Sequence, residues 1–158
     1  GTQIEAHMKN DNIVEFYPYL GSYAWVVPVN RDVVRIGVAG YKDTVRLFND
    51  FAKKKIGKDI DKKTIENQSG IIPLFSPRLK LQSDNIYLIG DAATFIKATT
   101  GGGINQGLKA AEIFFDSFEG YEKKVKKALY PNLYAHLFAH EIMKKFSEKD
   151  WNDLINKL

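Results

Sequence analysis

The most informative part of this sequence reads Asn85-Ile-Tyr-Leu-Ile-Gly-Asp-Ala-Ala93, and Thr100-Gly-Gly-Gly-Ile-Asn105 follows shortly after it. The run Ile86–Ile89 is almost wholly apolar, which is typical of a strand that is buried on both faces. Gly90 and Asp91 end this run, and a helix is expected to begin after the glycines. Because ligands of open α/β sheets bind beyond the carboxyl ends of the strands, this order of elements predicts a binding site.

The chemistry of this segment suits an anionic or electron-rich ligand. Glycines let a ligand approach the backbone closely, and a helix start presents free N–H groups and a positive dipole end. The Asp91 carboxylate is placed to accept hydrogen bonds from sugar-like hydroxyls. A purely structural interpretation stays open, in which Asp91 lies in a turn and the glycines cap a helix. No P-loop and no G-x-G-x-x-G motif is present, so the usual grip on a pyrophosphate is missing.

The N-terminal region predicts an antiparallel sheet and one helix. Aromatic and β-branched residues crowd four runs that turn residues separate, and the simplest arrangement is a four-stranded meander with one face free to cover something. The four runs are Gln3–Met8, Ile13–Tyr19, Tyr23–Val29 and Val33–Ala39. An amphipathic helix is expected over Thr44–Lys55, with Val45, Phe48 and Ala52 on its buried stripe.

The rest of the chain predicts helices that cover a sheet. Three apolar stripes have helical spacing, and Pro131 is expected to interrupt the helix between the second and the third. These stripes are Ile104, Leu108, Ala111, Phe115 and Phe118; Tyr121, Val125 and Leu129; and Tyr134, Phe138, Ile142 and Phe146. The expected fold class is α+β (mixed α/β), with an antiparallel sheet, a strand–loop–helix unit and C-terminal helices.

Composition excludes several classes of protein. With 44% hydrophobic and 27% charged residues the chain is not disordered, and no apolar run approaches the ~20 residues of a membrane-spanning helix. No signal peptide opens the sequence, and zero cysteines suit a reducing cytosol. We therefore expect a cytoplasmic protein.

Charged residues in the C-terminal region raise two further possibilities. His136 and His140 have the spacing of a metal pair, but no third ligand is evident, so no metal site is predicted. Lysines such as Lys123 and Lys127 form either a solvated helix face or a peripheral contact with anionic lipid. No aromatic platform lies among these lysines, and nucleic acid is not an expected partner.

The segment from Asn85 to Asn105 resembles the second FAD-binding motif of a flavoprotein group that includes the aromatic hydroxylases and the geranylgeranyl reductases. In that group the Gly-Asp carboxylate holds the ribityl chain, and the glycine loop and helix start face the pyrimidine edge of the flavin. The resemblance therefore implies cofactor-binding roles for Gly90, Asp91, Gly101, Gly102, Gly103, Ile104 and Asn105. Where the group often has a proline before the glycines, this sequence has Lys97-Ala98-Thr99.

A second motif narrows the resemblance to the geranylgeranyl reductases. Tyr23-Ala-Trp25-Val-Val-Pro28, followed by Gly37, looks like their Tyr-x-Trp-x-Phe-Pro…Gly-x-Gly signature, with Val27 replacing the Phe and Ala39 the last Gly. In that family the segment lines the substrate cavity, which implies this role for Tyr23, Trp25 and Pro28. The alternative is a cross-strand aromatic pair that packs a sheet face.

The resemblance covers residues 13–118 and implies part of a two-domain flavoprotein. Residues 1–75 would belong to the substrate or cap domain, 76–120 to the C-terminal part of the FAD-binding domain, and 121–158 to a C-terminal helical region. The implied activity is FAD-dependent reduction of isoprenoid double bonds in a prenyl lipid, by hydride transfer from reduced flavin and with a separate electron donor.

The resemblance assigns no catalytic residue, and Tyr23 is a proton-donor candidate from the motif alone. The missing N-terminal half of the same protein would be a partner, and the isolated chain is expected to be inactive. Two alternatives stay open: a fragment of a flavin monooxygenase or halogenase, and a non-catalytic folded interaction module.

Overall fold

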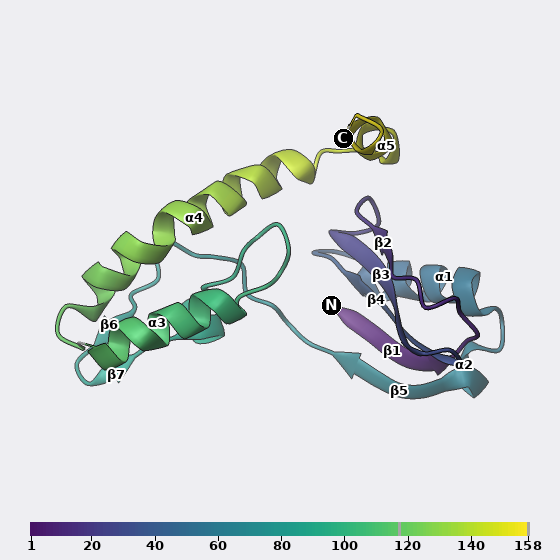
Figure 1. Cartoon of the computed structure of the whole chain (residues 1–158), viewed down its shortest axis with the longest axis horizontal. Helices are drawn as coiled ribbons and strands as arrows, with labels where there is room; N and C mark the ends of the chain where they lie inside the picture. Colours follow the sequence, from purple (N-terminus) through teal and green to yellow (C-terminus); the bar gives the residue numbers. More distant parts are fainter. Residues whose placement is uncertain (117, 158) are drawn as a thin grey trace. The chain divides into compact units, whose positions relative to one another are not determined.

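The computed structural model describes residues 1–116 and 118–157 of the chain. Contacts among these residues form two compact units, one made of Gly1–Ile71 with the chain from Phe146 onward, the other of Ile72–Lys145. Figure 1 shows the sheet and α1 in the first unit and α3 and α4 in the second. The fold is α+β, with an antiparallel sheet and several helices, as predicted. The domain bounds 1–75, 76–120 and 121–158 stay a prediction.

The first unit is built on a five-stranded antiparallel sheet. Its strands are β1 (Thr2–His7), β2 (Glu15–Tyr17), β3 (Tyr23–Asn30), β4 (Val33–Ala39) and β5 (Thr64–Ser69). Their order in space is β2-β3-β4-β1-β5, so the expected meander is wrong. β1 pairs with β4 instead of β2. Two backbone hydrogen bonds extend this contact along the β3–β4 turn: Met8 N donates to Asp32 O (2.9 Å), and Asn10 N donates to Arg31 O (3.0 Å).

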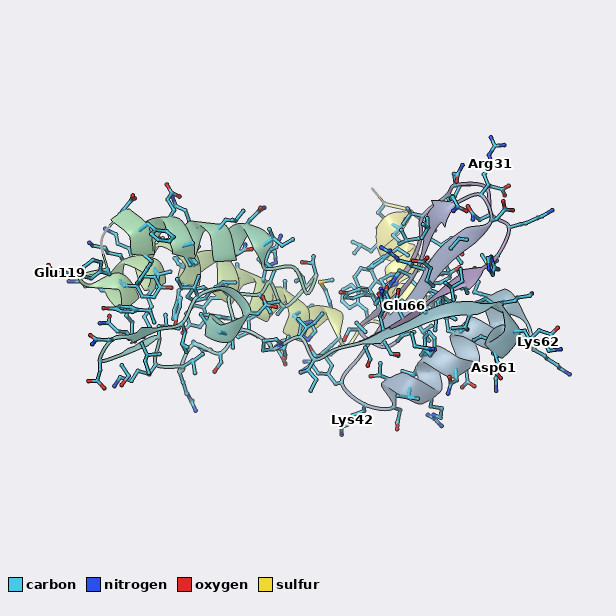
Figure 2. All side chains as sticks on the ribbon, turned by 90° about the horizontal axis from the view of Figure 1, so that it is seen from below. Arg31, Lys42, Asp61, Lys62, Glu66 and Glu119 are labelled. Carbon is cyan, nitrogen blue, oxygen red and sulfur yellow. The ribbon has the colours of Figure 1, made fainter. Side chains whose placement is uncertain are left out.

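One face of this sheet packs against helix α1 (Thr44–Ile56), and together they form the core of the first unit. Alternate residues of the strands, such as Val26 and Ile36, are buried there, as the period of two requires. Helix α1 contributes Phe48, Phe51 and Ala52 to the core. Val45 is 66% exposed, so its place on the predicted buried stripe is wrong. The short helix α2 (Ile60–Lys63) connects α1 to β5, and its side chains Asp61 and Lys62 are exposed (Figure 2).

The second unit begins with a small hairpin of β6 (Gln82–Ser83) and β7 (Ile86–Tyr87) and continues into a 3₁₀ turn, η1 (Gly90–Ala93). The expected strand Ile86–Ile89, buried on both faces, is wrong: β7 has two residues and pairs with β6, and Ile86 is 67% exposed. An apolar run predicts burial, but burial on both faces also requires other elements that pack on each face of the sheet.

Helices α3 (Ile104–Asp116) and α4 (Tyr121–Met143) complete the second unit. α4 buries Tyr121, Val125 and Leu129, as predicted. It also continues through Pro131, so the predicted interruption is wrong. Proline removes one helical hydrogen bond, but buried side chains on both of its sides, up to Leu133, hold this helix against the core.

The other two predicted stripes are largely exposed. On α3, Ile104 is 81%, Leu108 66% and Phe115 82% exposed, whereas Ala110 is buried. On α4, Tyr134, Phe138 and Ile142 are 48%, 70% and 45% exposed. Helical spacing identifies an apolar face, but whether that face is buried depends on what packs on it.

Helix α5 (Glu148–Ile155) belongs to the first unit and starts with a capping box between Ser147 and Asp150. Of the helices formed by residues 1–116 and 118–157, none has the length and the apolar character needed to cross a membrane.

Candidate functional site

The second unit brings Asp91 and the glycine loop together. Asp91 lies exposed in η1, directly after Gly90, whose φ of 62° lies in the left-handed region that favours glycine. A Cβ built on Gly103 would lie 3.4 Å from the Asp91 carboxylate oxygen Oδ1. The carboxylate therefore stands beside the start of α3.

Gly103 and Gly107 allow this close packing. A Cβ at Gly103 would meet the Phe95 carbonyl oxygen at 2.8 Å, and one at Gly107 would lie 3.4 Å from the Cα of Gly90. A side chain at Gly103 would force the loop away from α3, because the oxygen it meets belongs to the backbone.

The first turn of α3 carries no acidic side chain. Ile104 and Asn105 are both exposed, so their positions are open to a ligand. The first N–H groups of a helix have no acceptor within it, and they carry the positive end of the helix dipole. Gln106 adds a buried side-chain oxygen, Oε1, that has no hydrogen-bond partner among the described residues.

The loop before the glycines is tied to α4 through a histidine. His136 Nδ1 and Thr99 Oγ1 lie 2.7 Å apart and share a hydrogen bond. Burial and the nearby positive charge of Lys97 lower the pKa of His136 below its usual 6.5. His140, one turn further along α4, is buried, and the described residues contain no group of three metal-ligating side chains.

The sheet face opposite α1 carries the aromatic residues of the second motif. The rings of Phe16, Tyr23 and Trp25 form a row with centroids 5.4 and 5.5 Å apart. Burial raises the pKa of the Tyr23 phenol above its usual 10.0. Pro28 lies in β3 beyond the residues that pair with β2. Its missing backbone N–H therefore costs no hydrogen bond to β2.

Gly37 makes room for the indole of Trp25. A Cβ built on Gly37 would lie 2.2 Å from Trp25 Cζ2 and 2.7 Å from the Cβ of Gln3. Trp25 Nε1 donates a hydrogen bond to Gln3 Oε1 (3.1 Å), and Gln3 in turn bonds Gln68 on β5. The indole thus lies flat across β4, and the spacing between Trp25 and Gly37 has a steric cause.

Several of these contributors were not predicted from the sequence, Gln106 among them. Gly107 could have been found, because an isolated glycine inside a helical pattern usually marks a close packing contact. The Gln3–Gln68 pair and the Thr99–His136 pair have no local signal, since their members are 65 and 37 positions apart. The two motif regions lie in different compact units.

Comparison with known proteins identifies relatives of this chain. No protein-family model matches it. Digeranylgeranylglycerophospholipid reductase 3 of Methanosphaera stadtmanae is 32% identical over 114 residues, which cover 67% of this chain and 28% of that protein. Digeranylgeranylglycerophospholipid reductases of Methanocaldococcus jannaschii and Methanococcus aeolicus are 29% and 27% identical, and each match covers 96% of this chain and 44% of the relative.

The fold has a counterpart among solved structures. A geranylgeranyl bacteriochlorophyll reductase-like protein from Thermoplasma acidophilum matches 98% of this chain with a TM-score of 0.70 and 21% sequence identity, over 46% of its own length. The chain thus spans less than half the length of these relatives. The resemblance is confirmed: over most of its length this chain is similar to a part of proteins named as geranylgeranyl reductases.

Proposed function

We propose that this chain forms part of an FAD-dependent reductase that saturates isoprenoid double bonds of a prenyl lipid. The observation that carries the proposal is the position of the Asp91 carboxylate beside Gly103 at the start of α3. The names of the reductase relatives support the class of reaction.

The residues present fit the flavin half of that cofactor. Asp91 would accept hydrogen bonds from the hydroxyls of the ribityl chain. The N–H groups of the first turn of α3 would face the carbonyl edge of the ring, and no acidic side chain in that turn opposes negative charge there. The buried Gln106 Oε1, which has no partner within residues 1–116 and 118–157, offers an acceptor for a ligand N–H.

The aromatic face of the first unit would wall the cavity for the isoprenoid chain. Bound reduced flavin supplies the hydride, while the protein positions the reactants and excludes water. Trp25 and Pro28 would provide apolar surface, and the hydrogen bond of Trp25 to Gln3 fixes the indole. The Tyr23 phenol carries its proton at neutral pH, and burial, which raises its pKa above the usual 10.0, makes it a weak acid.

Lysines on α4 would hold the enzyme at the membrane surface where such a lipid lies. Lys123 and Lys127 are exposed, and both stand on the side of α4 opposite the buried Tyr121 and Val125. Each lysine near an anionic surface contributes about 1 kcal/mol. Co-sedimentation with anionic vesicles should therefore be salt-sensitive, and the double change of both lysines to Gln should weaken it by about thirtyfold, the equivalent of about 2 kcal/mol.

The cofactor site is tested by titrating flavins into the ¹⁵N-labelled chain and following amide signals by NMR. We expect riboflavin and FAD to shift the amides of Asp91 and of residues 101–105 with similar, weak affinity, because this chain lacks the motif that grips a pyrophosphate. ADP should leave the same amides unchanged.

The matched variants are Asp91→Asn and Asp84→Asn, which remove the same charge. Asp84 lies exposed in the β6–β7 turn with φ 50°, a conformation that asparagine tolerates. Asp91→Asn should weaken flavin binding roughly tenfold, since a hydrogen bond to a charged group contributes about 1.5 kcal/mol or more. The proposal fails if millimolar riboflavin does not shift the amide signals of residues 101–105, or if both variants bind flavin with the same affinity.

A folded interaction module is the second candidate. The specific observation in its favour is the apolar face of α3, on which Ile104, Leu108 and Phe115 are each more than half exposed. A contiguous apolar face of this kind marks an interaction site in many proteins. Concentration-dependent association that Leu108→Lys abolishes, together with no response to flavin, would favour this candidate over the reductase.

A further inference from the structure

The loop that precedes the three glycines is closed on itself by backbone hydrogen bonds. Lys97 N donates to Gly102 O (3.0 Å), and the N–H groups of Thr100 and Gly101 both donate to Lys97 O, at 3.1 and 2.9 Å. Three bonds over so short a segment make residues 97–102 move together. Gly103 and the start of α3 follow directly, so any displacement of the loop reaches the candidate flavin site.

Thr99 connects this loop to helix α4. Its hydroxyl Oγ1 lies 2.7 Å from Nδ1 of His136. His136 stands one turn beyond Leu133, which is fully buried in the core of the same unit. The imidazole is therefore presented from a rigid element.

We propose that His136 is a positioning residue, whose hydrogen bond to Thr99 fixes the 97–102 loop and with it Gly101–Gly103 beside Asp91. The proposal rests on the flavin site proposed above for its functional meaning. The contact itself can be tested without any flavin.

The charge state of His136 makes this contact sensitive to pH. Lys97 faces the imidazole from the loop, and His140 lies one turn along on α4. Burial of the imidazole disfavours its protonated form, and the positive charge of Lys97 adds to this effect, so the pKa of His136 lies below its usual 6.5.

The sign of the pH dependence follows from this lowered pKa. When the loop is undocked, the imidazole titrates nearer 6.5, so below that pH it binds more protons than when the loop is docked. The docked loop therefore loses stability as the pH falls from 6.5 towards the lowered pKa, and keeps it in full above 6.5.

The test is an NMR titration of the flavin-free chain between pH 4.5 and 8. It follows the imidazole carbon signal of His136 together with the well-separated amide signals of Gly101, Gly102 and Gly103. We expect the three glycines to shift with the same midpoint as His136 in the unmodified chain. In Thr99→Val, which keeps the shape of threonine but lacks the hydroxyl, the glycines should no longer follow His136.

Three further variants separate a specific contact from general damage. Thr99→Ser keeps the hydroxyl and should keep the coupling, and His136→Asn keeps a polar atom near the place of Nδ1 but should give pH-independent glycine signals. Lys97→Gln should raise the titration midpoint of His136. Ser83→Ala, which removes an exposed hydroxyl from β6, is the control and should behave as the unmodified chain.

Two outcomes would overturn the proposal: glycine signals that ignore the titration of His136, or coupling that persists in Thr99→Val. Flavin addition gives an independent result. If the glycine signals follow the titration of His136 but flavin shifts no signals, the contact is supported and the proposed cofactor function is contradicted. If flavin shifts the signals but the glycines do not follow His136, the cofactor function is supported and the role of His136 is contradicted. If both hold, flavin binding should weaken several-fold below pH 6.5 in the unmodified chain and stay constant in His136→Asn.

Discussion

Replacing Gly37 by alanine should displace the indole of Trp25 and destabilise the first unit. The new Cβ would lie 2.2 Å from Trp25 Cζ2 and 2.4 Å from Cε2, far inside van der Waals contact. On the other side the Cβ of Gln3 would be 2.7 Å away, so the methyl group has no free space. Trp25 must therefore leave its place over β4.

The cost has two parts. Loss of the hydrogen bond from Trp25 Nε1 to Gln3 contributes about 1 kcal/mol. Forcing an extra methyl into a packed site contributes about 1–3 kcal/mol more. With a urea dependence of about 2 kcal/mol per M, the unfolding midpoint of Gly37→Ala should fall by about 1–2 M.

The assay is urea unfolding followed by far-UV circular dichroism and by tryptophan fluorescence, with Gly70→Ala as the matched control. A Cβ on Gly70 would meet no atom within 4 Å, so this change should leave the midpoint nearly unaltered. Adding Trp25→Leu to Gly37→Ala should recover part of the loss, since the clash is with the ring. Equal midpoints for Gly37→Ala and Gly70→Ala would refute the steric explanation of the Trp25–Gly37 spacing.

Three further changes test the second unit and α5. Tyr121 is fully buried and its phenol donates to Leu88 O (2.8 Å), so Tyr121→Phe should lower the free energy of unfolding by about 1–3 kcal/mol in chemical denaturation. Burial raises the pKa of Tyr121 to about 12. Because the tyrosine of the unfolded chain ionises at a lower pH than the folded one, the unmodified chain should lose stability between pH 10 and 12, and Tyr121→Phe should lose less over the same range. Pro131→Ala should raise the melting temperature, because it restores a helical hydrogen bond within α4; a lower one would show that this helix needs the proline. Ser147→Ala removes the cap of α5 and should lower its helicity by circular dichroism, at a cost of about 1 kcal/mol; an unchanged spectrum would contradict the capping box.

Local patterns predicted several elements at nearly the bounds that the structure has. The run Val33–Ala39 is β4, residue for residue, and Thr44–Ile56 forms α1 one residue beyond its predicted end. α3 begins at Ile104, directly after the glycines. These elements depend on periodicity, turn residues and helix-breaking glycines, which act between neighbours in the sequence.

Strand pairing could not be predicted in the same way. The segment Thr64–Ser69 is mostly polar and lacks a strand pattern, yet it forms β5 because the open edge of β1 offers backbone hydrogen bonds. The meander failed for the same reason, since pairing is decided by which edge is available in space. Helix α4 passes through Pro131 because burial on both sides outweighs a local preference.

The candidate site shows the same division. The sequence by itself determined the residue types of the cradle: the carboxylate of Asp91, the three glycines and a helix start, all within one short segment. Only the tertiary structure placed Gly103 against Asp91, laid the Trp25 ring over Gly37 and joined Thr99 to His136. Contacts between distant residues form when the folded core brings their elements together, and no local pattern records them.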